Sequence, residues 1–262
     1  MQKFDFTNKV AVVTGGGGGI GRAVSLKLAE AGAKVVIVDI SEDAGMVTVN
    51  QITTQGGEAI FIQTDVTKEE DIQNYVQTTI DRYGKIDIFL NNAGWEGKIS
   101  SLVDYPTEEF DRVMSINVRG VFLGLKYVMP YMIAQKSGAI VNTASAAGLQ
   151  GTPNLAAYGA SKHAVLGLTK TAGFEGAIHG IRVNAVCPGP VNTEMMCSIE
   201  RGFGKGDPEA ALISRKAMAV KTPTGRYAKP EEIANLMMYL VSDFSTHIIG
   251  QQFVIDGGLI LT

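Results

Sequence analysis

Seven short aliphatic runs recur along this chain, and their spacing is the feature that most restricts its fold. The runs are rich in Val and Ile and mostly continuous, and they lie at residues 9–14, 34–39, 59–63, 86–91, 139–143, 182–187 and 252–255. Continuous apolar runs of this length are typical of strands that are buried on both faces of a parallel sheet. The intervals between the runs are too long for hairpins, so the strands must be joined by crossover connections.

Segments with helical spacing fill the intervals between these runs. Residues 21–31 place Ala23, Leu26 and Ala29 on one face of a helix, and Asp65 opens an acidic stretch that begins another helix. Strands that alternate with helices predict right-handed crossovers and an α/β fold, a doubly wound parallel sheet of about seven strands with helices on both faces. A sheet of this kind binds its ligands at the carboxyl ends of its strands.

Length and composition favour a single domain without a metal, a membrane span or a nucleic-acid partner. The chain has 262 residues, of which 45% are hydrophobic and only 19% charged, which excludes a disordered protein. Its net charge of −3 argues against binding along a nucleic-acid backbone. Cys187 and Cys197 do not form a zinc-site pattern, and the sequence shows neither a secretion signal nor an apolar run long enough to span a membrane. We therefore expect one soluble, cytoplasmic domain over residues 1–262.

A run of five glycines follows the first predicted strand directly and opens the first predicted helix. It extends from Gly15 to Gly19, and Gly21 follows one residue later. Glycine lets the backbone turn sharply and approach a pyrophosphate without an intervening Cβ, while the helix N-terminus supplies unpaired N–H groups and positive dipole charge. The position of the run therefore predicts a dinucleotide-binding turn rather than a flexible loop.

An acidic residue, Asp39, ends the second predicted strand. Its carboxylate can accept hydrogen bonds from both hydroxyls of an adenosine ribose and would repel a 2′-phosphate. No Arg or Lys lies within the glycine run or directly after Asp39, where Ile40 and Ser41 follow. The coenzyme that we expect is therefore NAD rather than NADP, and Asp39 can cap the next helix at the same time.

Three polar residues in the second half of the chain suggest the chemistry. Ser145 follows the fifth predicted strand, and Tyr158 and Lys162 are four residues apart, on one face of a helix. A free tyrosine has a pKa of about 10, and a neighbouring ammonium would lower that pKa by favouring the phenolate. Tyr158 is therefore the candidate proton acceptor, and Ser145 can bind the oxygen of an alcohol or carbonyl. The carbinol carbon would exchange hydride with a nicotinamide.

Six motifs occur in an order and spacing that resemble those of the short-chain dehydrogenase/reductase family. They are Thr14-Gly-x-x-x-Gly19-x-Gly21, Asn91-Asn92-Ala93-Gly94, Asn117, Ser145, Tyr158-x-x-x-Lys162 and Pro188-Gly189. The resemblance spans residues 9–258 and implies a Rossmann fold, an oxidoreductase with a nicotinamide coenzyme, and a homotetramer.

The resemblance also implies roles for individual residues. Asn117 joins Ser145, Tyr158 and Lys162 as the catalytic set, its backbone holding a water in a proton relay through Lys162, which also binds the nicotinamide ribose. Asp65 would contact adenine. Coenzyme contacts are expected at Gly15, Gly18, Gly19, Ile20, Gly21, Asp39, Ile40, Asp65, Val66, Asn92, Ala93, Gly94, Tyr158, Lys162, Pro188, Val191 and Thr193.

Residues 192–224 interrupt the strand–helix alternation without a clear strand, so we expect a substrate-binding loop there. Methionines in this stretch predict an adaptable, mainly apolar pocket. The substrate contacts that we expect are Trp95, Ser145, Ala147, Leu149, Tyr158, Met195 and Met196. Glu96-Gly97-Lys98 resembles a segment of relatives that reduce cyclic ketones, and the sequence leaves open whether these charges face the pocket.

The sequence thus predicts an NAD-dependent secondary-alcohol dehydrogenase or carbonyl reductase whose substrate is small to medium in size and apolar or cyclic. Two alternatives stay open. One is a 3-oxoacyl-thioester reductase, which the Asp39 argument disfavours because such relatives resemble NADPH users. The other is an NAD-sensing binding protein without catalysis, which is disfavoured because Asn117, Ser145, Tyr158 and Lys162 occur together.

Overall fold

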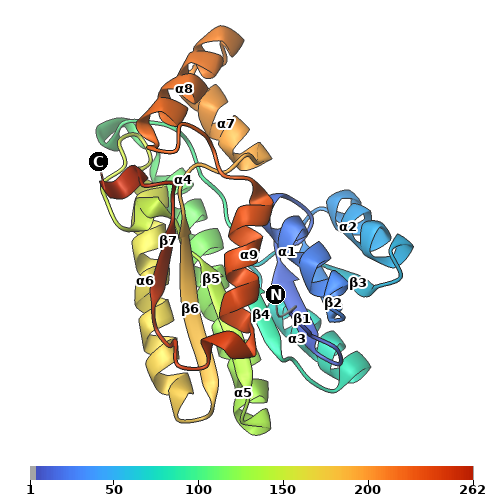
Figure 1. Ribbon diagram of the computed structural model, residues 1–262. Helices are drawn as coiled ribbons and strands as arrows, with labels where there is room; N and C mark the ends of the chain where they lie inside the picture. The colour runs from blue at the N-terminus through green and yellow to red at the C-terminus, as the bar shows by residue number, and fades with distance from the viewer. Residues whose placement is uncertain (1–3, 262) are drawn as a thin grey trace.

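The computed structural model describes residues 4–261 and contains a seven-stranded parallel sheet (Figure 1). The strands are β1 (Val10–Thr14), β2 (Lys34–Asp39), β3 (Glu58–Gln63), β4 (Ile88–Asn91), β5 (Gly138–Thr143), β6 (Ile181–Pro188) and β7 (Gln252–Ile255). Their order across the sheet is β3-β2-β1-β4-β5-β6-β7, with parallel pairing throughout. The predicted doubly wound fold is confirmed, and each predicted strand is found with its ends within two residues of the expected ones.

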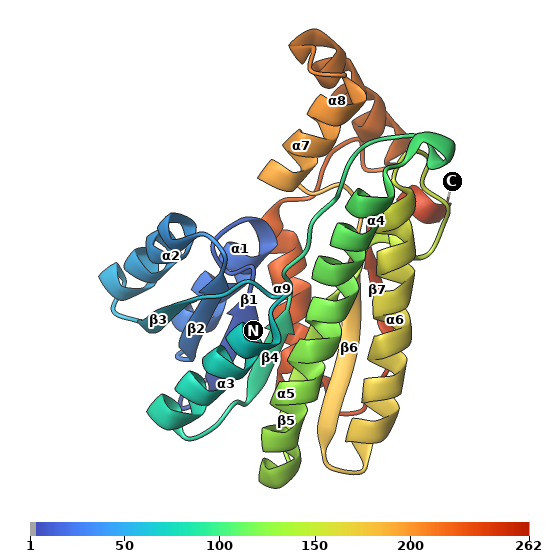
Figure 2. The same ribbon diagram turned by 180° about the vertical axis from the view of Figure 1, so that it is seen from behind.

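Helices cover both faces of the sheet, as the two opposite views show (Figures 1 and 2). They are α1 (Gly19–Glu30), α2 (Glu42–Thr54), α3 (Glu69–Tyr83), α4 (Thr107–Met114), α5 (Gly120–Gln135), α6 (Ala156–Ala177), α7 (Glu194–Phe203), α8 (Pro208–Lys221) and α9 (Pro230–Val241). A π-helical turn, Ser115–Arg119, joins α4 to α5, and short 3-10 turns lie at Leu102–Asp104, Ala146–Gly148, Asp243–Ser245 and Leu259–Leu261. Within residues 4–261, no helix is both long and apolar enough to cross a membrane.

The strands are apolar on both sides because each side meets its own layer of helices. Val13 of β1 belongs to a buried cluster with Leu28 of α1 and Met237 of α9, whereas its neighbour Val12 belongs to the opposite cluster with Ile72 of α3. Burying a side chain of this size stabilises the fold by about 1.5–3 kcal/mol. The sheet is therefore a rigid support that holds the carboxyl ends of its strands side by side.

The segment at residues 192–224 differs from its prediction as a loop. It forms two helices, α7 and α8, which stand beyond the carboxyl ends of the strands (Figure 1). Local signals explain both helices: the Thr193 hydroxyl accepts a hydrogen bond from the Met196 N–H at the start of α7, and Asp207 followed by Pro208 begins α8. We refer to α7, α8 and their connection as the helical hairpin.

Candidate active site

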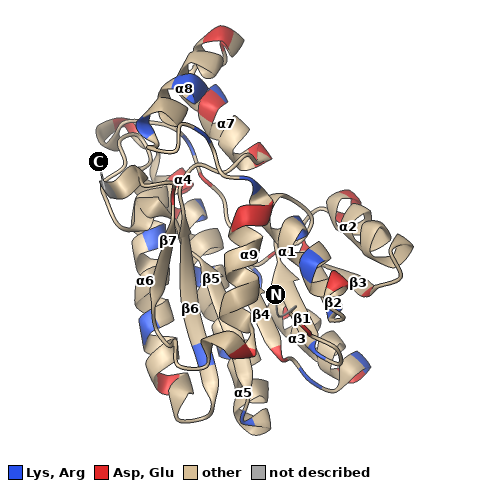
Figure 3. Cartoon of the chain, viewed as in Figure 1, with Lys and Arg blue, Asp and Glu red and all other residues tan. Residues whose placement is uncertain are grey.

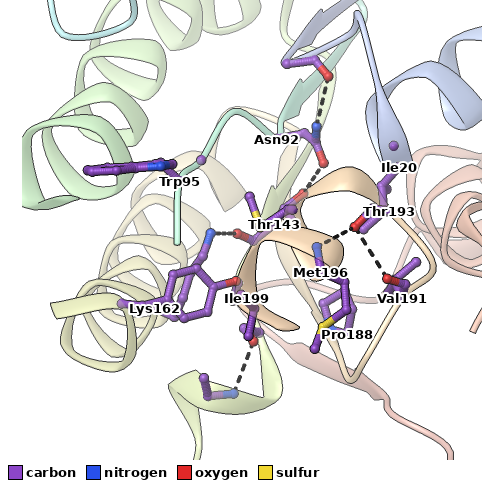
Figure 4. Close-up of a pocket in the computed structure, with 18 of the residues that line it drawn as sticks. Ile20, Asn92, Trp95, Thr143, Lys162, Pro188, Val191, Thr193, Met196 and Ile199 are labelled. Carbon is purple, nitrogen blue, oxygen red and sulfur yellow. Dashed lines mark hydrogen bonds between the residues drawn. The ribbon is translucent and has the colours of Figure 1, made fainter. Parts of the chain in front are cut away.

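A cavity of about 740 Å³ lies where the strands end, between the sheet and the helical hairpin. Residues that follow all seven strands line it, as do residues of α7 and α8. Figure 4 shows part of this lining, including Met196 and Ile199 of α7. Its lining includes Gly15 after β1, Asp39 and Ile40 at the end of β2, Asp65 after β3, Ala93 after β4, Ser145 after β5 and Val191 after β6. The topology of a doubly wound sheet thus brings residues from across the chain to one place.

With one exception, the residues predicted to contact the coenzyme line this cavity. The exception is Gly21, which is buried within α1 and does not line the cavity. A Cβ on Gly21 would lie 2.0 Å from the carbonyl oxygen of Gly15 and 2.8 Å from Nδ2 of Asn92. Glycine is needed at this position so that α1 can pack against the turn that precedes it.

The glycine turn has room for a diphosphate. Gly15 has a φ of +63°, in the left-handed region that favours glycine, and a Cβ there would lie 3.0 Å from Cα of Ala93. Gly18 is the N-cap of α1 and gives it no side-chain cap. A Cβ on Gly18 would meet no atom of the described residues within 4 Å. The turn therefore presents the uncapped end of α1 to open space, which fits an anionic group.

The Asp39 carboxylate is fixed at the edge of the cavity by two backbone N–H groups. Its Oδ2 accepts a hydrogen bond from Gly17 at 2.9 Å, and its Oδ1 accepts one from Ser41 at 3.0 Å. A Cβ on Gly17 would lie only 2.8 Å from Oδ2, so this glycine makes the contact possible. Asp39 therefore supports the glycine turn and the start of α2 while its side of the cavity stays acidic.

Hydrogen bonds connect the glycine turn to Lys162 across three strand ends (Figure 4). Asn92 Nδ2 donates to the carbonyl oxygen of Thr14 at 3.1 Å. Thr143 Oγ1 donates to Asn92 Oδ1 at 3.0 Å, and Lys162 Nζ donates to the Thr143 carbonyl oxygen at 2.8 Å. We call this series the strand-end chain. It fixes the Lys162 ammonium relative to the turn that would hold a diphosphate.

Ser145, Tyr158 and Lys162 meet in the cavity as the sequence predicts. Tyr158 and Lys162 lie one turn apart on α6, and Nζ of Lys162 is 5.5 Å from the centroid of the Tyr158 ring. Ser145 precedes the 3-10 turn, where its Oγ accepts a hydrogen bond from the Ala147 N–H at 3.1 Å. The Ser145 side chain also lies close enough to the Tyr158 hydroxyl to lower its pKa. The two hydroxyl groups are thus directed at the same part of the cavity.

The protonation of these groups differs from the prediction. Burial raises the pKa of Tyr158 to about 12, although the hydrogen bond from Ser145 lowers it; the nearby Glu96 carboxylate raises it further. Burial also lowers the pKa of Lys162 to about 8. The expectation that Lys162 lowers the pKa of Tyr158 is therefore not met in this structure, because desolvation outweighs the attraction. At neutral pH Tyr158 is a phenol that can donate a proton.

Asn117 lies in the π-helical turn and is fully buried. Its Oδ1 accepts a hydrogen bond from the Trp95 N–H at 2.8 Å, and its Nδ2 donates to the Trp95 carbonyl oxygen at 2.8 Å and to Ser161 Oγ at 2.9 Å. A Cβ on Gly94 would lie 3.3 Å from both Asn117 Oδ1 and Lys162 Nζ, which places these two groups around the same glycine. Asn117 does not line the cavity. Its side chain holds the segment that carries Trp95.

The substrate side of the cavity contains the predicted residues except Leu149. Leu149 instead packs against the core cluster on the α3, α5 and α6 side of the sheet and does not line the cavity. Trp95 lines the cavity, and the central carbon of the Arg112 guanidinium lies over its ring, 4.5 Å from the centroid. Glu96, which is 6% exposed, and Lys98 are not part of the lining.

Sequence reasoning missed a second group of lining residues. They are Arg112, Ile116, Gln150, Gly151, Thr152, Pro153, Leu155, Glu194, Ile199, Phe203, Met218, Lys221 and Leu259. For α7 a signal existed, because Met195, Ile199 and Phe203 recur at intervals of four and share one helix face. Leu259 gave no such signal, since only the folded chain brings residues after β7 to the cavity.

The shifted pKa of Lys162 predicts a pH dependence for carbonyl reduction. If reduction requires the Tyr158 phenol together with the Lys162 ammonium, its rate should be flat below neutral pH. Because the pKa of Lys162 is about 8, we expect kcat/KM for a ketone to fall above that pH. The fall should approach about tenfold per pH unit when measured with saturating reduced coenzyme. A rate that stays constant to about pH 10 would show that reduction does not need the ammonium.

Comparisons with known proteins place this site in a family. A family model described as enoyl-(acyl carrier protein) reductase matches residues 15–260. Levodione reductase of Leifsonia aquatica is 40% identical over 256 residues, covering 97% of this chain and 94% of the relative. The chain belongs to the short-chain dehydrogenase/reductase family. It is therefore an oxidoreductase, as the sequence predicts.

Other family members agree closely in length and fold. Cyclohexanol dehydrogenase of Acinetobacter sp. (strain SE19) is 38% identical over 96% of this chain and 95% of its own. A 3-oxoacyl-[acyl-carrier-protein] reductase of Thermotoga maritima is 38% identical over 97% of this chain and 98% of its own. The crystal structure of an NAD+-bound xylitol dehydrogenase superposes with a TM-score of 0.92 at 39% identity, covering 97% of this chain and 99% of that one.

Proposed function

We propose that this enzyme interconverts a secondary alcohol and its ketone with NAD(H). The observation that carries the proposal is a single cavity with two distinct ends. Ser145, Tyr158 and Lys162 converge at one end, and the glycine turn with Asp39 forms the other. A proton donor, an oxygen-binding hydroxyl and a dinucleotide cradle in one cavity are the parts that a hydride-transfer enzyme needs.

The residues of the cavity fit NAD. Its diphosphate would lie against Gly18 at the uncapped start of α1, and its adenosine ribose hydroxyls would bind the Asp39 carboxylate. Ile40, which is 66% exposed beside Asp39, offers an apolar surface to adenine. Val191 and Thr193 would hold the nicotinamide carboxamide. When bound, the nicotinamide ring supplies the hydride acceptor or donor for the carbinol carbon.

The protein's own residues would hold the substrate and move its proton. Ser145 Oγ would donate a hydrogen bond to the substrate oxygen, and the Tyr158 phenol would donate its proton to that oxygen during reduction and take it back during oxidation. The ammonium of Lys162, held by the Thr143 carbonyl at 2.8 Å, would stabilise the phenolate that forms. We assign Asn117 to this set because its side chain holds the Trp95 segment beside Lys162.

The walls of the cavity favour an apolar or cyclic substrate of small to medium size. Met195, Met196 and Ile199 of α7 line the cavity together with Trp95 and Leu259. Flexible methionine side chains can adapt to rings of different size. The relative named cyclohexanol dehydrogenase is named for a cyclic alcohol of this kind, whereas xylitol dehydrogenase is named for an acyclic polyol.

A substrate panel with both coenzymes tests this proposal. Secondary alcohols, cyclic diols, polyols and 3-hydroxyacyl thioesters would each be assayed with NAD and NADP by the absorbance of the reduced coenzyme. We expect turnover of cyclic or apolar secondary alcohols with NAD. Turnover confined to 3-hydroxyacyl thioesters with NADP would instead support a 3-oxoacyl-thioester reductase, as one of the relatives is named.

The same assay can measure how a substitution of Asp39 changes the preference between NAD and NADP. A 2′-phosphate beside the Asp39 carboxylate is repelled by about 1–4 kcal/mol at close range, which equals about 10- to 10³-fold in coenzyme preference. We expect Asp39→Ala to reduce the preference for NAD over NADP by at least about tenfold. Asp39→Asn is the milder companion variant: it removes the charge and keeps an acceptor for one of the Gly17 and Ser41 N–H groups, because its amide nitrogen replaces the other oxygen, and it should change the preference in the same direction. A wild-type preference for NADP would contradict the role of Asp39.

We further propose that residues 1–262 act as one catalytic domain and that the enzyme is a homotetramer. Large apolar side chains on two neighbouring helices support the assembly: Phe174 of α6 and Ile178 directly after that helix are 83% and 84% exposed, and Phe122 of α5 is 47% exposed. Exposed apolar side chains gathered on one face are typical of an interface. Sedimentation measures the mass of the assembly directly.

A further inference from the structure

A cluster of charged and polar side chains lies behind the cavity, between the two helices of the hairpin. Its centre is an ion pair between Glu200 of α7 and Arg215 of α8. Basic and acidic positions occur on both helices of the hairpin (Figure 3). Asn192 and Tyr227 complete the cluster. We call these four residues the hairpin cluster. None of them lines the cavity.

The Arg215 guanidinium contacts each of the other three residues. Its Nη1 donates to Oε1 and Oε2 of Glu200 at 3.2 Å and 3.4 Å, and its Nη2 donates to Oδ1 of Asn192 at 2.9 Å. Its central carbon lies 4.7 Å from the centroid of the Tyr227 ring. Glu200 is 7% exposed and Tyr227 is 8% exposed. The ion pair is therefore largely shielded from water on the carboxylate side.

The cluster joins the two ends of the hairpin to its two helices. Asn192 lies just before α7 and Tyr227 follows α8, so the four residues come from the entry, both helices and the exit. Backbone hydrogen bonds join the entry and exit segments of the hairpin at the same place. The Asn192 N–H donates to the Ala228 carbonyl at 2.9 Å, and the Ala228 N–H donates to the Pro190 carbonyl at 2.9 Å. The hairpin is thus fixed at its base by backbone and side chains together.

The same two helices form the substrate wall. Met195, Met196 and Ile199 of α7 and Met218 of α8 line the cavity, whereas Glu200, next to Ile199 in sequence, does not. Glu200 follows Met196 by one helical turn, so the ion pair lies at the edge of the wall and links it to α8. A change in the angle between α7 and α8 would therefore move the wall without altering any residue that touches the substrate.

We propose that Glu200 and Arg215 are positioning residues that set the shape of the substrate wall. The inference rests on the proposed alcohol dehydrogenase function and adds the groups that determine which substrates fit. Removing Arg215 leaves the Glu200 carboxylate shielded from water without its charged partner, which is strongly unfavourable. The helices would separate to hydrate that carboxylate, and the wall would lose its shape. Removing both charges together avoids this penalty.

Three variants test the proposal: Arg215→Met, Glu200→Gln and the double variant. With a bulky cyclic alcohol, we expect Arg215→Met to raise KM by about tenfold or more. With a small acyclic alcohol, we expect the same variant to keep kcat and KM within about twofold of the wild-type values. The KM for NAD should not change. The double variant should recover most of the loss seen with Arg215→Met, because it leaves no unpaired carboxylate. Hydrogen exchange over residues 194–221 should increase in Arg215→Met alone.

Arg201→Met is the matched control. Arg201 pairs with Glu194 on the same helix at 2.7 Å, but the two side chains are 59% and 81% exposed, so its loss should change none of these readouts. Equal losses of kcat for all alcohols in Arg215→Met, or unchanged KM and unchanged exchange, would overturn the positioning role. If the wild-type enzyme oxidises no alcohol, the proposed function fails, while hydrogen exchange still shows whether the ion pair holds the hairpin.

Discussion

Replacing Tyr158 by phenylalanine should lower kcat by about 10²- to 10⁴-fold, the contribution typical of a lost general acid or base. The ring and its packing would remain, so we expect the fold and the affinity for NAD to be retained. The reason for the large effect is positional: Tyr158 lines the cavity with Ser145, which lowers its pKa, and Nζ of Lys162 lies 5.5 Å from the centroid of its ring. Initial rates of NADH formation would measure kcat, thermal unfolding would measure the stability of the fold, and NAD titration would measure the affinity for the coenzyme.

A second tyrosine supplies the control for this variant. Tyr239 of α9 is 37% exposed and does not line the cavity, so Tyr239→Phe should leave kcat unchanged within about twofold. Ser145→Ala should lower kcat as well, because Ser145 would no longer bind the substrate oxygen. Wild-type turnover by a folded Tyr158→Phe protein would mean that another group moves the proton.

Replacing Gly21 by alanine should damage the fold before it affects any contact with the coenzyme. The new Cβ would lie 2.0 Å from the Gly15 carbonyl oxygen, so α1 or the glycine turn must move. Overpacking of this kind typically costs about 1–3 kcal/mol or more, and each kcal/mol lowers Tm by about 2–4 °C in a domain of this size. We expect a loss of about 3 kcal/mol and, because the turn is displaced, loss of NAD binding. Thermal unfolding and coenzyme titration measure both.

Gly18→Ala is the matched control in the same turn. Gly18 has an extended backbone with a φ of −155°, which any residue adopts, and a Cβ there would meet no described atom within 4 Å. The unfolding temperature of the Gly18→Ala protein should therefore stay near that of the wild type. Its affinity for NAD should nevertheless fall by about tenfold or more, because the methyl group occupies the space proposed for the diphosphate. Equal effects of both substitutions on Tm would contradict this division between packing and binding.

The sequence predicted the sheet and most of the coenzyme side because both follow from local signals. Buried parallel strands require continuous apolar runs, and the residues that end such strands must lie together at one edge of the sheet. Asp39 and Ser145 were therefore identifiable as site residues from their positions, whereas Asn92 was identified through the family resemblance. Gly21 shows the limit of this reasoning, because a motif glycine can serve the packing of α1 as well as contact with a ligand.

The substrate side was less predictable because it depends on the arrangement of helices. The helical hairpin was interpreted as a loop, although Thr193 and Asp207 are good helix caps. Leu149 was placed in the pocket by its proximity to Ser145 in sequence, but it turns into the core. Leu259 reaches the cavity only after the whole sheet has formed.

Proximity in sequence also failed to predict protonation. The spacing of Tyr158 and Lys162 correctly placed them on one helix face, and the ring and the ammonium are 5.5 Å apart. The spacing did not indicate how far the two side chains would be buried from solvent. Desolvation at both groups raises the pKa of Tyr158 to about 12 and lowers that of Lys162 to about 8, and burial of this kind arises only when the chain is folded.

The closed base of the helical hairpin has a consequence for how such enzymes diverge. Val191 and Ala228 pair where the chain leaves the sheet and where it returns, so the 36 intervening residues form a removable module on an otherwise constant platform. The strand-end chain from Thr14 to Lys162 contains no residue of that module. Substrate range can therefore evolve, or be engineered by exchange of the module between relatives, while the proton-transfer machinery is inherited unchanged.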